Sequence, residues 1–196
     1  MLEIFHKGGP VMWPLLVCSV TVVAMVLERL VFLFREIGRR DPERVRAILA
    51  AVEAGRLDEA SQTAHGTRDF VARVLGQALR HREDGLANAV IHASGEELDR
   101  FNRGLTVLDT VVTLAPLLGL LGTVTGMIRT FGLLGGAELG APQAVTGGIA
   151  EALIATAFGL GIAIVALVPL NFLNARLERA RRQIEAAANQ LELHLP

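Results

Sequence analysis

Three polar side chains in otherwise apolar segments are the residues of this sequence best suited to chemistry. Glu151 lies in the run GGIAEALIATAFGLGIAIVAL, residues 147–167, and Thr156 follows it by five positions. Thr123 lies in a second apolar run, LAPLLGLLGTVTGMI, residues 114–128. A carboxylate in such surroundings can relay a proton or set a local field, and hydroxyls can support a short chain of water. The alternative is that these groups make hydrogen bonds that only fix helix packing.

Three runs of the sequence are long enough to carry these residues across a membrane. The chain has 196 residues, 52% of them hydrophobic, and the apolar residues gather in blocks instead of following an even core pattern. We expect spanning helices at residues 11–33, 106–131 and 144–170, because ~20 apolar residues cross ~30 Å of hydrocarbon. The first run is too long, and has too few basic residues before it, for a cleaved signal peptide. The predicted fold class is therefore an all-α membrane protein with three spans.

The distribution of arginine predicts how the spans are oriented. Twelve arginines lie in residues 34–105 and four more follow Leu170, whereas residues 132–143 have none. Basic segments stay in the cytoplasm. We therefore expect outer segments at residues 1–10 and 132–143, a cytoplasmic helical domain at 34–105 and a cytoplasmic C-terminal helix at 171–196. Arg129, near the outer end of the second span, is expected to extend to the lipid headgroups.

The cytoplasmic domain is expected to be helical. Asp41 is a typical N-cap, Pro42 suits the first helical position and Gly55 suits a terminator. Two more helices are expected between Gly55 and Gly85, separated near Gly66.

Two long helices are expected to join this domain to the spans. Pro116 is the only proline between Leu86 and Phe131, so one helix is expected to run directly into the second span. The third span is expected to continue without a break into a heptad seam that needs partner helices. Its members are Leu173, Leu177, Ala180, Ile184, Ala187 and Leu191. We expect this seam to pack both on the chain's own helices and in a bundle shared between subunits.

Several functional classes receive no support from the sequence. It has no phosphate-binding loop, dinucleotide fingerprint or nucleophile motif, and Cys18 is its only cysteine. Its five histidines form no ligand set, and the net charge of −1 gives no reason to expect nucleic acid. We therefore expect no enzymatic activity, no cofactor and no metal.

The helical period sorts the second span into faces. One face is small and polar, unlike a surface for lipid, and a pore-facing role is expected for Asp109, Pro116, Thr123 and Thr130. Gly119 and Gly126 share this face, and Gly122 and Gly126 form a GxxxG pair that permits close helix approach. Proline in a span frees a backbone carbonyl, which needs neighbours or water. The simpler alternative for Thr123 is a hydrogen bond to its own helix one turn back.

The third span has a narrow stripe of small residues for helix packing. The stripe consists of Gly148, Ala152, Ala155, Gly159, Ala163 and Ala166. Glu151 and Thr156 flank it on opposite sides, and the lipid-facing side is expected to be Leu153, Leu160, Ile164 and Val168. Both polar residues are therefore expected at the edges of a close helix contact, where they reach a central cavity.

Two motifs in these spans resemble a known family. P-L-L-G-L-L-G-T-V-T-G, from Pro116 to Gly126, and G-I-A-E-A-L-I-A-T-A-F-G-L, from Gly148 to Leu160, closely resemble the MotA/TolQ/ExbB proton-channel family. The likeness is to the TolQ and ExbB branch, and W-P-L-L-V-C-S-V and Glu28–Arg29 in the first span also fit it. Two residues depart from that pattern. Thr125 stands where these relatives usually carry tryptophan, and Val165 stands where many of them carry proline.

The resemblance implies a homopentameric ring in the bacterial inner membrane, with the outer segments in the periplasm. Two copies of a single-span ExbD-like or TolR-like partner would occupy the pore, and an aspartate in the partner's span would take up and release protons. The resulting movement would energise a TonB-like or TolA-like protein. Thr123, Thr156 and Glu151 match the family's two channel threonines and its glutamate.

Two other functions are compatible with the residues. One is a small-substrate transporter, which would need a larger set of convergent polar groups, and the other is a non-conducting membrane scaffold built on the heptad seam. The sequence leaves open which process is energised, among iron or cobalamin uptake, envelope maintenance, export and motility. It favours protons over sodium only through the resemblance.

Overall fold

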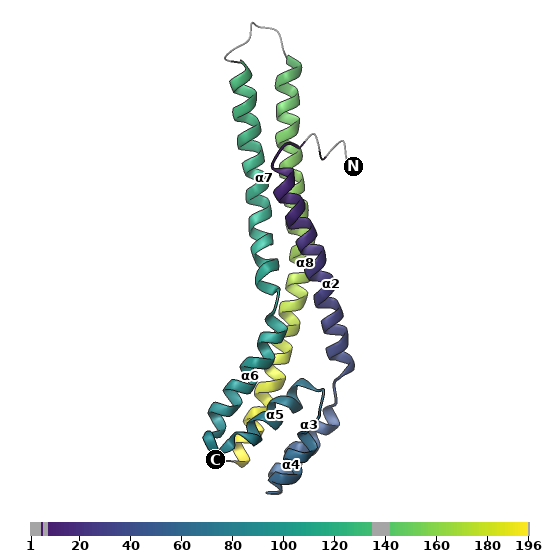
Figure 1. Ribbon diagram of the computed structural model, residues 1–196, viewed down its shortest axis with the longest axis vertical. Coiled ribbons are helices and arrows are strands. Elements are labelled where there is room, and N and C mark those ends of the chain that lie inside the picture. Colours follow the sequence, from purple (N-terminus) through teal and green to yellow (C-terminus); the bar gives the residue numbers. More distant parts are fainter. Residues whose placement is uncertain (1–4, 6–7, 135–141, 196) are drawn as a thin grey trace. The chain divides into compact units, whose positions relative to one another are not determined.

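The described part of the chain folds entirely into helices. The computed structural model describes residue 5 and residues 8–134 and 142–195. Its elements, shown in Figure 1, are α2 (Met12–Gly38), α3 (Pro42–Glu53), α4 (Leu57–Ala64), α5 (Phe70–Arg80), the short 3₁₀ helix η1 (Arg82–Asp84), α6 (Leu86–Asn102), α7 (Leu105–Leu134) and α8 (Pro142–His194). The all-α prediction is confirmed for these residues.

Three of these helices are long and apolar enough to cross a membrane. They are Met12–Gly38, Leu105–Gly132 and the part of α8 from Thr146 to His194. The expected spans at residues 106–131 and 144–170 fall within α7 and α8, and all but the first residue of the span expected at 11–33 falls within α2. Most of the two outer segments, residues 1–4, 6–7 and 135–141, lies outside the described residues, so their structure and their side of the membrane stay predictions.

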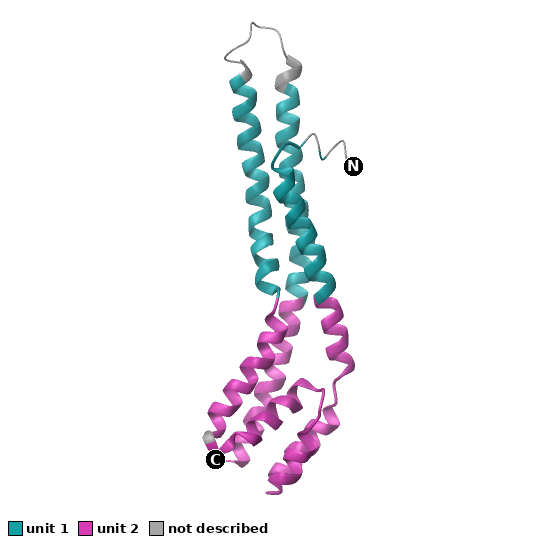
Figure 2. Cartoon of the chain, in the orientation of Figure 1, with its two compact units in different colours: residues 1–28, 104–172 teal, residues 29–103, 173–196 magenta. Residues whose placement is uncertain are grey.

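The helices belong to two compact units (Figure 2). The first comprises residues 1–28 and 104–172, and the second comprises residues 29–103 and 173–196. The first unit contains the apolar parts of α2, α7 and α8. Each helix contributes a stripe of buried side chains at helical spacing, including Met12, Leu15 and Val22, then Leu108, Val111 and Ala115, then Ala152, Ala155 and Ala166.

The second unit has its own apolar core. Ile48, Val74, Leu75 and Leu79 are almost fully buried there. The heptad seam of α8 joins the same core, through Ala180, Ile184, Ala187 and Leu191. The seam therefore packs on the chain's own helices, which is the first of the two roles expected for it.

The helix ends of the second unit follow their local sequence. The Asp41 side chain accepts a hydrogen bond from the Arg44 amide at 3.0 Å, and Pro42 begins α3. Gly55, Gly66 and Gly85 adopt positive φ where helices end, the left-handed conformation that glycine accepts without a steric penalty. The three helices and the breaks near Gly55 and Gly66 are confirmed, but α5 ends at Arg80, and the separate 3₁₀ helix η1 precedes Gly85.

The expectation of one helix from Leu86 through the second span is wrong. α6 ends at Asn102 and α7 begins at Leu105. Between them, Gly104 has φ +78°, and the Arg103 amide donates to the Asp99 carbonyl at 3.0 Å. The expectation rested on the absence of proline between the two helices, but a glycine in the left-handed conformation also ends a helix. Downstream, α8 continues through Pro169 without interruption, as expected.

A buried ionic network stabilises the second unit. Arg73 donates to both carboxylate oxygens of Glu97, at 2.8 and 2.6 Å, and to Glu36 at 3.0 Å. Burial alone would lower the pKa of the Arg73 guanidinium, but the bonds and charges of Glu97 and Glu36 outweigh it and hold that pKa above its usual range. Truncating one member would leave a buried charge without its partner.

Candidate functional site

The candidate site is built on a close, antiparallel contact between α7 and α8. A Cβ built on Gly159 would lie 2.5 Å from the Ala115 carbonyl oxygen and 3.1 Å from the Gly119 Cα atom. Only glycine lets the two backbones approach this closely. Gly122 and Gly126 lie against Ala155 and Ala152 in the same way, so the contact runs along the small-residue stripe that the sequence predicted.

Thr156 makes a hydrogen bond across this contact. Its Oγ1 donates to the Gly119 carbonyl oxygen at 2.9 Å, and the side chain is half-buried. In apolar surroundings such a bond contributes about 0.6–1.7 kcal/mol to helix association. The hydroxyl proton is therefore committed to the neighbouring helix, while the oxygen retains lone pairs that can accept from water.

Thr123 bonds to its own helix. Its Oγ1 donates to the Leu120 carbonyl oxygen at 2.6 Å, which is the local arrangement offered as the simpler alternative. The side chain is half-buried and follows Gly122, which lies against Ala155 of α8. Like Thr156, it presents an acceptor oxygen and no uncommitted proton. Its neighbour Thr125 is exposed and donates to Leu121, so the two threonines differ in exposure and not in bonding.

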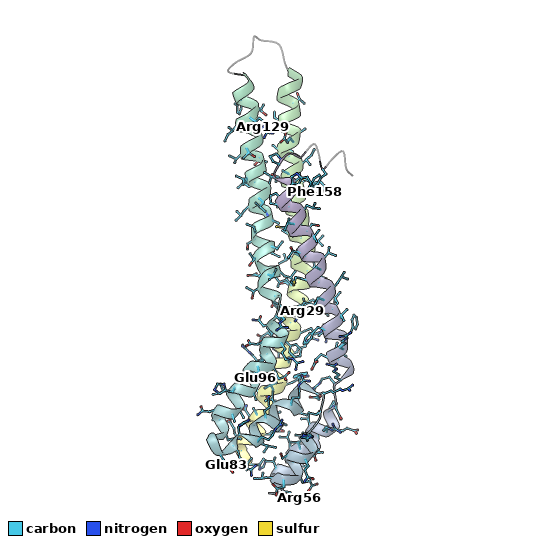
Figure 3. All side chains as sticks on the ribbon, viewed as in Figure 1. Arg29, Arg56, Glu83, Glu96, Arg129 and Phe158 are labelled. Carbon is cyan, nitrogen blue, oxygen red and sulfur yellow. The ribbon has the colours of Figure 1, made fainter. Side chains whose placement is uncertain are left out.

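Glu151 forms an ion pair with Arg129 of the neighbouring helix. An Arg129 guanidinium nitrogen lies 3.3 Å from Glu151 Oε1, and the side chains are 59% and 25% exposed. Arg129 projects from α7 as labelled in Figure 3. Sequence reasoning missed this pair, since it assigned Arg129 to the headgroups. The feature that indicates this pair is the packing register of the two helices. When Gly126 lies against Ala152, positions 129 and 151 come to the same level along the contact.

A third element closes over the Glu151 carboxylate. Gly9 precedes α2 and has φ +73°, and a Cβ built there would overlap Glu151 Oε1. Glycine is needed at this position for both its conformation and the missing side chain. Glu151 is thus surrounded by α7, α8 and the turn before α2.

The remaining predicted residues divide between packing and exposed positions. Thr130 is 3% exposed, donates to the Gly126 carbonyl at 2.9 Å and packs against Gly148. Asp109 is exposed and Pro116 is half-buried on α7. The pore-facing roles of these three residues stay predictions, and in this chain Thr130 lies in the helix contact.

The site contains no metal-ligand set within the described part of the chain. No cluster of three or more His, Cys, Asp or Glu side chains capable of holding an ion occurs among these residues. The arrangement instead offers hydroxyl oxygens as water acceptors and one carboxylate balanced by an arginine.

Comparison with known proteins identifies close relatives. The model of the MotA/TolQ/ExbB proton channel family matches residues 62–186, which include Thr123, Glu151 and Thr156. The putative biopolymer transport protein ExbB-like 1 of Synechocystis sp. is 40% identical over 202 residues, covering 98% of this chain and 78% of that protein. The biopolymer transport protein ExbB of Neisseria meningitidis serogroup A is 31% identical over 211 residues, covering 98% and 95%. The Tol-Pal system protein TolQ of Haemophilus influenzae is 41% identical over 93 residues, covering 47% and 41%.

Proposed function

Since this chain belongs to the ExbB and TolQ branch of the MotA/TolQ/ExbB proton channel family, we propose that it is the channel subunit of a proton-driven motor in the inner membrane. In this proposal, proton flow moves a single-span partner of the ExbD or TolR type. The partner then energises a periplasm-spanning protein of the TonB or TolA type. The N-terminus lies in the periplasm, and both the arginine-rich domain and the C-terminus lie in the cytoplasm.

The observation that carries this proposal is the polar group at the α7–α8 contact. Glu151 and Thr156 lie at a contact otherwise made by glycine and alanine, and Thr123 is the neighbour in sequence of Gly122, which belongs to that contact. Ionisable and polar groups are costly inside a membrane and are usually retained for function. Packing alone would have been satisfied by the small residues that make the rest of the contact.

The proposed roles follow from the bonding of each group. Thr123 and Thr156 have committed their hydroxyl protons to carbonyl oxygens, so they contribute acceptor oxygens to a chain of water along the helices. Glu151, paired with Arg129, sets the local field and fixes the junction. The group that takes up and releases protons is then an aspartate on the partner's span.

The proposed assembly is a homopentamer around two copies of the partner. Large apolar side chains remain exposed along the spans, among them Trp13 and Val17 on α2, Leu117 and Ile128 on α7, and Ile164 and Val168 on α8. Lipid alone could cover such faces, but a ring also needs apolar faces on more than one span. The exposed apolar side chains on all three spans are consistent with this requirement and support the proposed ring.

Purification from native membranes tests this proposal. Native mass spectrometry of the extracted complex should find five copies of this chain with two copies of a small protein whose single span contains an aspartate. A scaffold or a substrate transporter would be extracted without such a partner. Recovery of the chain alone, under conditions in which its own oligomer survives, would overturn the motor assignment.

A further inference from the structure

The second unit contains an arginine-rich cavity that the proposed channel function does not use. Arg39, Arg40, Arg44 and Arg68 line an open cavity of about 430 Å³, together with Asp41 and Thr67. Its walls come from three places: the end of α2, the start of α3 and the turn between α4 and α5. Residues from separate segments thus bring four arginines to one concave surface.

The acidic side chains around the cavity do not balance these arginines. Of the described residues lining it, Asp41 is the only acid, and it already caps α3 while lying 3.6 Å from Arg44. Arg40 is held by Asp69 beneath it, with two contacts of 2.8 Å. Glu36, which lies 3.9 Å from Arg39, already bonds to Arg73. Arg68 makes no side-chain ion pair within the described part of the chain. The cavity therefore has a positive excess, centred on Arg39 and Arg68.

The framework of the cavity is rigid at its base. Asp69 is buried and accepts from Arg40, from the Asp41 amide at 2.7 Å and from the Val71 amide at 2.8 Å. Arg40 also stacks over the Phe70 ring, 4.6 Å from its centroid. These contacts tie the turn before α5 to the segment before α3. These contacts fix the backbone from which the lining arginines extend, so a ligand that needs several of them does not have to order that backbone.

The lining narrows the class of ligand. Arginine forks match the oxygens of phosphate in two-point contacts. No aromatic ring lines this cavity among the described residues, so it has no surface on which a nucleotide base would stack. Its lining is polar, which leaves it unsuited to an acyl chain. A compact, phosphate-bearing group fits these features.

The position of the cavity indicates where such a group would come from. The apolar run of α2 ends near Leu33 and Phe34, and Arg39 follows six residues after Leu33, about 9 Å along a helix. The polar layer of a bilayer extends roughly 5–8 Å beyond the hydrocarbon on each side. Arginines just beyond a spanning helix attract anionic lipids. In the proposed orientation this end of α2 faces the cytoplasm, where the leaflet carries a negative surface potential.

We propose that the cavity lined by Arg39, Arg40, Arg44 and Arg68 binds a phosphate group, supplied by the headgroup of an anionic phospholipid or by a soluble phosphate ion. The headgroup enters the cavity and its acyl chains stay outside, beside the exposed apolar residues Phe34 and Ile37 at the end of α2. Arg68 and Arg44 supply the contacts that a substitution can remove without disturbing Asp69.

Binding of small soluble ligands to the full chain in detergent tests the proposal. Dihexanoylphosphatidylglycerol, dihexanoylphosphatidylcholine and inorganic phosphate are titrated separately. Arg68→Gln should weaken binding about tenfold, and the Arg44→Gln, Arg68→Gln double variant should weaken it further. The double variant Arg56→Gln, Arg182→Gln removes the same charge from exposed positions of the same unit and serves as the control.

The outcomes separate the two sources and the opposing explanation. Tighter binding of the phosphatidylglycerol than of either the phosphatidylcholine or inorganic phosphate, lost in the arginine variants, assigns the anionic lipid headgroup. Equal binding of the phosphatidylcholine and the phosphatidylglycerol would overturn an anionic lipid as the ligand. Binding of inorganic phosphate as tight as that of the phosphatidylglycerol, and lost in the same variants, assigns a soluble anion. No binding of either, or an equal loss in the control, overturns the site, because the attraction would then be bulk charge. Proton flux plays no part in the measurement, so its result is independent of the proposed channel function.

Discussion

Replacing Gly159 by alanine is expected to force α7 and α8 apart at the candidate site. The new Cβ would lie 2.5 Å from the Ala115 carbonyl oxygen and 3.1 Å from the Gly119 Cα atom. Both are backbone atoms, so no side-chain rotation can relieve the overlap. The helices must separate locally by about 1 Å to restore ordinary contact.

The cost has two parts. Overpacking of a close contact costs about 1–3 kcal/mol. The separation also stretches the 2.9 Å bond from Thr156 to Gly119 beyond the usual range, which removes about 0.6–1.7 kcal/mol. The two parts sum to about 1.6–4.7 kcal/mol, and the higher helix propensity of alanine returns up to ~1 kcal/mol, so Gly159→Ala should lower the free energy of unfolding by about 1–4 kcal/mol.

The assay is unfolding in mixed micelles of increasing SDS content, followed by far-ultraviolet circular dichroism. Gly161→Ala is the matched control, because a Cβ there meets no heavy atom within 4 Å. Alanine should leave that variant as stable as the parent, or more stable by up to ~1 kcal/mol. Equal stability of the two variants would refute the close contact.

A compensating pair sharpens the same test. A Cβ on Gly122 would lie 2.5 Å from the Ala155 Cβ, which is a side-chain atom. Gly122→Ala should therefore be rescued by Ala155→Gly, whereas no side-chain change can rescue Gly159→Ala. If the second substitution adds to the damage of the first, the register of α7 against α8 is wrong.

Three further predictions each concern a single residue. Thr156→Val should lower stability by about 0.6–1.7 kcal/mol while Thr156→Ser retains it, and equal unfolding midpoints for the two would mean that the bond to Gly119 contributes nothing. Asp69→Ala removes a buried acceptor that caps α5 and pairs with an arginine, so it should lower stability in thermal unfolding by about 3–5 kcal/mol. The exposed control Asp58→Ala should cost less than ~1 kcal/mol, and comparable losses in the two variants would count against the buried network. Gly104→Ala places a side chain at φ +78° and should lower the free energy of unfolding by about 1–3 kcal/mol. Gly95→Ala, within α6, should leave that free energy unchanged or raise it. An unchanged stability of Gly104→Ala would argue for a continuous helix.

The features that the sequence predicted correctly are those set by local or periodic patterns. The cap at Asp41 and the stop at Gly55 depend on residues within one turn of the helix end. The stripe of small residues in α8 depends only on the helical period, and its alanines are buried as expected. Such features need no knowledge of what lies opposite.

The features that it missed depend on tertiary contacts. Gly95 lies within α6, whereas Gly104 ends that helix, and nothing in the local sequence separates the two glycines. The pairing of Arg129 with Glu151 requires the register between two helices, and single-helix reasoning gave each residue its own environment. Gly9 acquires its role only because the turn before α2 folds over Glu151.

Proton uptake by liposomes is the measurement that tests the central claim most directly. The chain and its co-purified partner are reconstituted together, an imposed membrane potential drives uptake, and an internal pH-sensitive dye reports it. Uptake should exceed that of empty liposomes and should fall in Glu151→Gln, with assembly intact. Glu178→Gln, at an exposed position on α8, should leave it unchanged. Wild-type uptake by Glu151→Gln would contradict the role of that carboxylate, and no uptake by the intact complex would contradict the channel itself.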